Sequence, residues 1–143
     1  MQRARVLRVA RVRVGAIGLN FADVFSVLGL YAAFSERPPL SVAGLEFAGT
    51  VEEAGAACGY AVGDRVFGVT RFGAFADSVT QRGKLLRPTP AGWTDAEAAA
   101  LLVQGLTAYY GLAKLGAATA GSRVLVHSAA GGVGMLSLEI CAA

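Results

Sequence analysis

A run of β-forming residues that enters a glycine-rich turn near the end of the chain constrains the fold more than any other stretch. Residues 124–127 favour a strand, residues 128–134 form a run of small residues, and residues 135–143 have the composition of a helix. A strand, a tight glycine turn and a helix in this order begin a doubly wound α/β domain. Glycine permits positive φ and close backbone approach, and a helix N-terminus attracts phosphate. The stretch therefore predicts a pyrophosphate-binding loop, although small-residue turns also serve close packing.

The chain before this turn has the pattern of a mainly β domain. Residues 6–14 alternate apolar and basic side chains, which is typical of a half-buried strand. Further short strands are expected at residues 45–53, 64–69, 74–81 and 85–87, and a helix at residues 21–28 that ends at Gly29. Short strands separated by glycine turns favour an irregular barrel.

A helical segment links this barrel to the glycine turn. Thr94-Asp95-Ala96-Glu97 has the spacing of a capping box, so a helix is expected from Thr94 to residue 103. Gln104-Gly105 is expected to interrupt it, and a second helix should follow at residues 106–115 and end at Gly116. The expected architecture is a mainly β irregular barrel with a helical bridge at residues 1–116, followed by the first βα unit of a Rossmann (α/β) domain at residues 117–143. The strand of that unit is expected at residues 123–128.

Composition excludes several other classes of protein. Of the 143 residues, 55% are hydrophobic and 16% are charged, which argues against intrinsic disorder. The net charge of +3 comes largely from arginines that alternate with apolar residues in the first strand, so no nucleic acid is expected as a partner. The charge-free run at residues 98–113 is too short and too polar for a membrane span. Two distant cysteines and the lack of a secretory signal point to the cytoplasm or an organelle matrix.

Seven motifs in order carry a resemblance to a known family. They are Gly18-Leu19-Asn20-Phe21-Ala22-Asp23-Val24, Gly44-Leu45-Glu46-Phe47-Ala48-Gly49, Val62-Gly63-Asp64-Arg65-Val66, Gly73-Ala74-Phe75-Ala76, Ala98-Ala99-Ala100-Leu101, Leu106-Thr107-Ala108-Tyr109 and residues 124–134. Together they resemble the medium-chain dehydrogenase/reductase superfamily, in its zinc-free quinone oxidoreductase branch. The enoylreductase domains of polyketide synthases belong to the same branch and are equally similar. The resemblance spans residues 6–143 but only part of the family's length.

The resemblance implies a GroES-like catalytic domain, a coenzyme domain and NADPH in the cleft between them. Reduction would proceed by hydride transfer to a small-molecule quinone, enone or enoyl thioester, and a homodimer is compatible with the family. Asn20 matches an asparagine beside the nicotinamide and the substrate, where its amide could hydrogen-bond a carbonyl. Tyr31 matches a tyrosine of the substrate cleft, and Thr107 a residue near the nicotinamide ribose. The pyrophosphate loop would comprise Ser128, Ala129, Ala130, Gly131, Gly132, Val133 and Gly134.

Simpler interpretations compete with several of these assignments. Asn20 could merely cap the helix that begins at Phe21, and Tyr31 could make a hydrophobic contact only. His127, the one histidine, is expected as a structural imidazole in the strand rather than a general acid or base. No metal site is expected, because Leu45 stands where zinc-dependent relatives carry a histidine ligand and because the chain has only two cysteines.

Three functional hypotheses follow. The chain is the amino-terminal portion of an NADPH-dependent quinone or enone reductase, a piece of a polyketide synthase enoylreductase domain, or a truncated, non-catalytic interaction module that keeps the GroES-like fold. The preference for NADP over NAD rests on the resemblance alone, since the residue that reads the ribose is expected about 20 residues after the glycine turn. We expect the isolated 143-residue chain to bind NADPH weakly or not at all and to lack activity.

Overall fold

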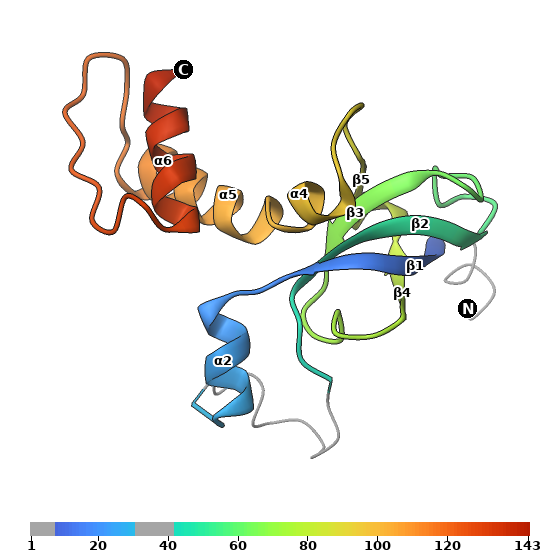
Figure 1. Cartoon of the computed structure of the whole chain (residues 1–143). Coiled ribbons are helices and arrows are strands. Elements are labelled where there is room, and N and C mark those ends of the chain that lie inside the picture. Colours follow the sequence, from blue (N-terminus) through green and yellow to red (C-terminus); the bar gives the residue numbers. More distant parts are fainter. Residues whose placement is uncertain (1–7, 31–41) are drawn as a thin grey trace. The chain divides into compact units, whose positions relative to one another are not determined.

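The computed structural model describes residues 8–30 and 42–143 (Figure 1). The chain divides into two compact units, Met1–Ala100 and Leu101–Ala143, and each unit is described by itself. The division lies earlier than the expected domain boundary after Gly116, which stays a prediction.

The first unit is built on one curled antiparallel sheet. Its five strands are β1 (Val9–Gly18), β2 (Glu46–Ala54), β3 (Arg65–Val69), β4 (Ser78–Arg82) and β5 (Leu86–Pro88). They lie in the order β4-β1-β2-β3-β5, and every neighbouring pair is antiparallel (Figure 1). The mainly β architecture predicted from the glycine-spaced strands is therefore confirmed.

The alternating pattern of the first strand places its apolar side chains in the core. Ala10 and Val12 of β1 are fully buried, whereas Arg11 and Arg13, which alternate with them, are exposed. The same core takes Phe47 and further apolar side chains from the other strands, namely Val51, Val66, Val79 and Leu86. Side chains of a strand point alternately to opposite faces, so the alternation in β1 sends its apolar side chains into the core and its arginines out to solvent.

One predicted strand is shorter than the sequence pattern indicated. Residues 74–77 were expected at the start of a strand, but β4 begins only at Ser78. The backbone N–H groups of Ala74 and Phe75 instead donate to the carbonyls of Gly44 and Ala43, at 3.1 and 3.0 Å. These bonds hold Ala74 and Phe75 against the approach to β2, and the segment meets β1 at its last residue, where the Asp77 carbonyl accepts from the Val14 N–H at 2.9 Å.

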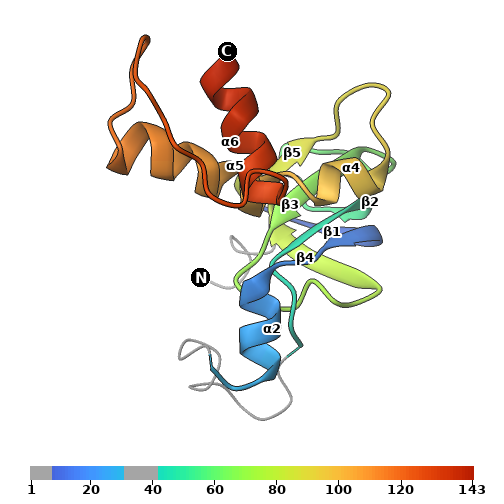
Figure 2. The ribbon, with the colours of Figure 1, turned by 60° about the vertical axis from the view of Figure 1, so that its left-hand side comes forward.

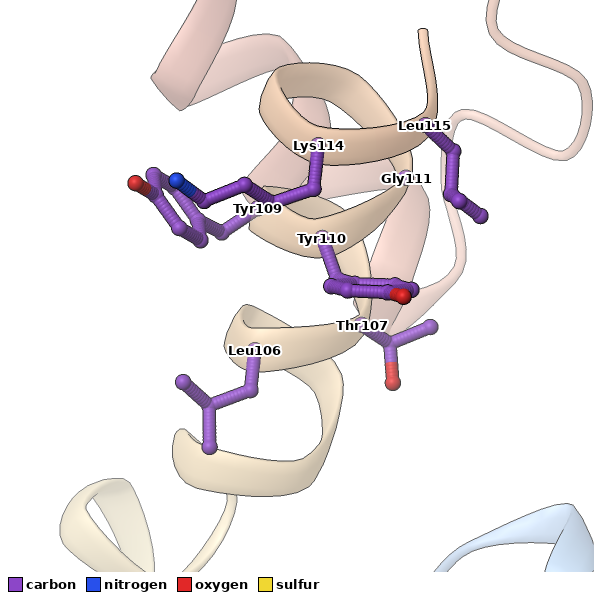
Figure 3. Close-up of a pocket in the computed structure, with 7 residues that line it drawn as sticks. All are labelled: Leu106, Thr107, Tyr109, Tyr110, Gly111, Lys114 and Leu115. Atoms are coloured by element: carbon purple, nitrogen blue, oxygen red, sulfur yellow. The ribbon is translucent and has the colours of Figure 1, made fainter.

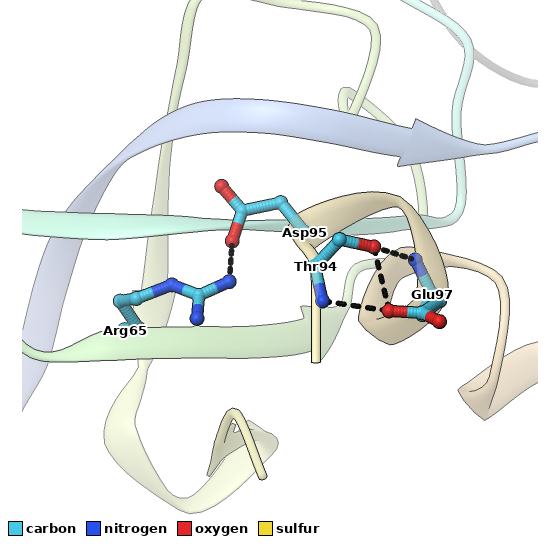
Figure 4. Close-up of polar contacts among 4 residues, drawn as sticks. All are labelled: Arg65, Thr94, Asp95 and Glu97. Atoms are coloured by element: carbon cyan, nitrogen blue, oxygen red, sulfur yellow. Dashed lines mark hydrogen bonds and ion pairs between the residues drawn. The ribbon is translucent and has the colours of Figure 1, made fainter. Parts of the chain in front are cut away.

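Helices α2 and α4 belong to the first unit. Helix α2 (Phe21–Val27) follows directly from the end of β1, with Asn20 as its N-cap. Helix α4 (Asp95–Ala99) packs against β1, β2 and β3 and is visible beside these strands in Figure 2. Its predicted capping box is confirmed: Thr94 Oγ1 accepts from the Glu97 N–H, and a Glu97 carboxylate oxygen accepts from the Thr94 N–H (Figure 4).

An ion pair ties α4 to the sheet. The Arg65 guanidinium, on β3, lies 2.6 Å from a carboxylate oxygen of Asp95, the first residue of α4 (Figure 4). A Cβ at Gly15, on β1, would collide with that carboxylate. Gly15 therefore leaves the room that the Asp95 carboxylate occupies while it pairs with Arg65.

The second unit consists of helices α5 (Leu102–Tyr109) and α6 (Gly132–Ala142), with the π-helical segment η2 (Tyr110–Leu115) continuing α5. The expected interruption at Gln104-Gly105 was wrong, because both residues lie inside α5 and the break falls after Ala99, at residues 100–101. Ala98 and Ala99 are buried where α4 ends. Packing of the short α4 on the sheet thus decides where the helix stops, and helix propensity does not.

The predicted strand at residues 123–128 was also wrong. Residues 122–126 are not part of a strand, and residues 127–130 form a turn. A parallel strand needs a neighbour that accepts and donates its backbone hydrogen bonds. Within the described residues no such neighbour pairs with this segment, and Leu125 is 82% exposed. Helix α6 begins at Gly132, three residues before the expected start.

Candidate functional site

The glycine turn leads into the N-terminus of α6. The Gly131 N–H donates to the Ser128 carbonyl at 2.9 Å, and the Met135 N–H donates to the Gly131 carbonyl at 2.8 Å. Gly131 is the extended N-cap residue, so the first N–H groups of α6 lie just beyond the turn. A helix start of this kind offers unpaired N–H donors and partial positive charge to an anion.

Close packing requires a glycine at one position of the turn. Gly134 is buried, and a Cβ there would lie 2.6 Å from the Ala129 Cα and would also overlap the Ser128 carbonyl oxygen. A Cβ at Gly132 would meet only the end of the Gln104 side chain on α5, which is flexible and can move away. Ser128 has φ of 54°, in the left-handed region that non-glycine residues rarely adopt. Ser128 and Ala129 thus pack tightly against Gly134 in the first helical turn of α6.

The same turn is open to solvent on its other side. Ser128, Ala130, Gly131 and Val133 are at least partly exposed. Because these residues are exposed and follow one another into a helix N-terminus, the residues present fit a bound pyrophosphate. His127 is exposed in the turn rather than held in a strand, so the expectation of a structural imidazole in a strand was wrong.

Thr107 lies on α5 beside an open hollow of about 940 Å³ (Figure 3). The hollow is lined by Leu106, Thr107, Tyr109, Tyr110, Gly111, Lys114 and Leu115. The Thr107 hydroxyl donates to the Val103 carbonyl at 2.6 Å, which leaves its oxygen lone pairs as acceptors. The Lys114 ammonium lies 5.8 Å from the centre of the Tyr109 ring, a cation–π contact. The role of Thr107 near a ribose stays a prediction.

Asn20 sits where β1 ends and α2 begins. Its backbone N–H donates to the Asp23 carboxylate at 2.9 Å, and its side-chain amide donates to Glu46 Oε1, also at 2.9 Å. The capping interpretation of Asn20 is compatible with this position, but the side-chain bond to Glu46 goes beyond a cap. Asn20 as a whole is half-buried.

Glu46 is the residue that the sequence pattern did not single out. It is 1% exposed, and its carboxylate accepts a hydrogen bond from the Asn20 side-chain amide. A buried carboxylate costs free energy unless it is hydrogen-bonded. The sequence feature that could have indicated a buried carboxylate was a glutamate placed directly before the apolar residues of β2.

Three further expectations concern a tyrosine, a metal and a membrane. Tyr31 lies outside the described residues. Within residues 8–30 and 42–143, no group of three or more His, Cys, Asp and Glu side chains could hold a metal ion. In the same part of the chain, none of the helices has the length and apolarity to cross a membrane.

A family model of the alcohol dehydrogenase GroES-like domain matches residues 8–114. Among curated proteins, a mycocerosic acid synthase-like polyketide synthase of Mycobacterium tuberculosis is 42% identical over 133 residues. That match covers 92% of this chain and 6% of the synthase.

Solved structures agree with this family match. A CurK enoyl reductase is 33% identical with a TM-score of 0.88, and the match covers 96% of this chain and 43% of that one. A quinone oxidoreductase of Escherichia coli, complexed with NADPH, is 33% identical with a TM-score of 0.82. That match covers 95% of this chain and 41% of the oxidoreductase. The chain therefore spans well under half the length of these proteins.

Proposed function

The chain belongs to the alcohol dehydrogenase GroES-like domain family, within the medium-chain dehydrogenase/reductase superfamily, and from that membership we propose that it is part of an NADPH-dependent reductase of an enoyl thioester, an enone or a quinone. The observation that carries the proposal is the glycine turn closed onto α6 by Gly134, since its tight packing and open N–H face suit a pyrophosphate. We also propose that residues 117–143 begin the coenzyme domain.

The residues of this chain would bind and orient the reactants. The N–H groups between Ser128 and the start of α6, apart from that of Gly131, which donates to the Ser128 carbonyl, would hold the pyrophosphate. Thr107 would accept a hydrogen bond from the ribose. Asn20 would donate a side-chain N–H to the substrate carbonyl, and Tyr31 would line the substrate cleft. Bound NADPH would supply the hydride that the substrate's carbon accepts. An N–H donor placed on the carbonyl stabilises the negative charge that develops there.

The enoyl thioester is the substrate that we favour among the three. The similar polyketide synthase and the CurK enoyl reductase support this choice, whereas the similar Escherichia coli protein supports a quinone. We place the protein in the cytoplasm or an organelle matrix and propose a homodimer, which its molecular mass in solution would test.

The experiment is a reductase assay on the complete gene product that contains residues 1–143. Oxidation of NADPH is followed with an enoyl thioester, an enone and a quinone, each with NADH as the matched control. Turnover of the enoyl thioester with NADPH supports the proposal, and preferred turnover of the quinone supports the quinone oxidoreductase alternative. Absence of turnover with all three substrates would contradict the reductase proposal and favour a non-catalytic module.

A further inference from the structure

A buried carboxylate lies at the entrance to β2. Glu46 is 1% exposed, and its Oε1 accepts a hydrogen bond of 2.9 Å from the Asn20 side-chain amide. Burial of an ionised group is unfavourable unless partners compensate for the lost water. Asn20 is one such partner, and it lies two residues after the end of β1, at the N-cap of α2.

The surrounding backbone is shaped to receive this carboxylate. Gly18 stands opposite Glu46 in the register of β1 and β2. A Cβ at Gly18 would overlap the Glu46 Cγ and Oε1 and would lie 2.5 Å from the Ala99 carbonyl oxygen at the end of α4. Any residue larger than glycine would therefore displace the carboxylate. Two strands and one helix end build the position of Glu46.

The hydrogen bond to Glu46 fixes the orientation of the Asn20 side-chain amide but occupies only one of its two N–H donors. A primary amide has two N–H donors, and Glu46 accepts from this nitrogen at one of them. A hydrogen bond to a carboxylate is shorter and stronger than one between neutral groups, so it holds the amide in one orientation. It also decides which end of the amide is nitrogen, because a carboxylate accepts and does not donate. The second N–H stays on the half-buried side chain for another acceptor.

We propose that Glu46 is a positioning residue that holds the Asn20 side-chain amide with its second N–H available to the carbonyl oxygen of the substrate. The inference rests on the proposed reductase function. In that function Glu46 does not touch the substrate or the coenzyme and acts through Asn20. Its charge matters because a neutral amide at position 46 would hold Asn20 less firmly and could present its own N–H to it.

The test compares three variants of the complete gene product with wild type in the NADPH-dependent reductase assay. Glu46→Gln is expected to lower kcat about tenfold, the difference between a charged and a neutral hydrogen bond, with KM for NADPH unchanged. Glu53→Gln is the matched control on the same strand. Glu53 is largely exposed and pairs with Arg11 at 3.4 Å, so this variant should keep wild-type kcat.

The third variant, Asn20→Asp combined with Glu46→Gln, reverses the polarity of the pair. The introduced glutamine amide can then donate to the introduced aspartate, so the link between β1 and β2 persists and the melting temperature should stay near that of wild type. Position 20 no longer carries a side-chain N–H, so kcat should fall at least about a hundredfold. A purely structural role would predict that activity follows the melting temperature.

Each outcome decides the inference. Wild-type kcat in Glu46→Gln, or activity of the reversed pair close to wild type, would overturn the positioning role while leaving the reductase function standing. If Glu46→Gln fails to fold, the kcat of the reversed pair still tests the inference, because activity close to wild type without a side-chain N–H at position 20 would overturn it. A wild-type gene product without reductase activity would overturn the proposed function and this inference with it.

Discussion

Replacing Gly134 by alanine tests the packing of the glycine turn, and replacing Gly105 by alanine is its matched control. Both glycines lie inside helices of the second unit. In a helix interior alanine is favoured over glycine by about 1 kcal/mol. At Gly105 the new methyl group would meet Leu101 and Leu136 side-chain carbons at 3.6 and 3.7 Å, which is ordinary contact. Gly105→Ala should therefore stabilise the chain by about 1 kcal/mol.

At Gly134 the same methyl group would overlap backbone. It would lie 2.6 Å from the Ala129 Cα and 2.8 Å from the Ala129 carbonyl carbon, and it would overlap the Ser128 oxygen. Overpacking costs about 1–3 kcal/mol, and backbone yields less readily than side chains, so the cost should exceed the gain in helix propensity. We expect Gly134→Ala to destabilise the chain by about 1–2 kcal/mol.

The assay is thermal unfolding followed by far-ultraviolet circular dichroism. For a chain of this size, 1 kcal/mol corresponds to about 3–5 °C in melting temperature. Gly105→Ala should melt above wild type and Gly134→Ala below it. If both variants melt above wild type, the turn does not approach α6 as closely as the structure indicates, and the explanation of Gly134 is refuted.

Three further predictions concern the first unit, each with unfolding in urea as the measurement. Leu86→Ala should lower the free energy of unfolding by about 2–5 kcal/mol, because Leu86 is fully buried and packs against Gly68; a loss below about 1 kcal/mol would contradict its place in the core. Thr94→Ala should cost about 1 kcal/mol by removing the N-cap of α4, and unchanged stability would mean that the cap does not contribute. Hydrogen bonds from the Thr94 backbone N–H and hydroxyl lower the pKa of Glu97 from its ordinary 4.5, so the ionised form stabilises the fold above pH 4.5 and that contribution disappears as the pH falls through the lowered pKa. Glu97→Gln should accordingly flatten the loss of stability below pH 4.5, and an unchanged acid profile would refute this assignment.

Local patterns in the sequence predicted the elements whose causes are local. The capping box predicted from the spacing of Thr94 and Glu97 is formed in the structure. The alternation of apolar and basic residues around Val12 correctly predicts the buried face of β1. Asn20 stands at the N-cap of α2, directly before the predicted helix. Side-chain chemistry within a few residues explains all of these features, so the sequence suffices to find them.

The features that the sequence did not reveal depend on distant partners. Residues 74–77 leave the strand because the N–H groups of its first two residues donate to carbonyls of residues 43 and 44. Residues 123–128 have β-forming side chains but no paired neighbour within the described residues. The environment of Glu46 is formed by a hydrogen bond from Asn20 and by the close approach of Gly18, which lie 26 and 28 residues earlier in the chain. Tertiary contacts of this kind override local propensity and leave no local signature.

The proposed coenzyme site can be tested by binding of NADPH to the glycine turn. The complete gene product is titrated with NADPH while the coenzyme's fluorescence is followed, for wild type, Gly134→Ala and Gly105→Ala. We predict saturable binding for wild type and Gly105→Ala, and an affinity at least about tenfold lower for Gly134→Ala, whose methyl group displaces the turn. Absence of saturable binding by the wild type, or equal affinity of Gly134→Ala, would contradict the assignment of this turn to the coenzyme.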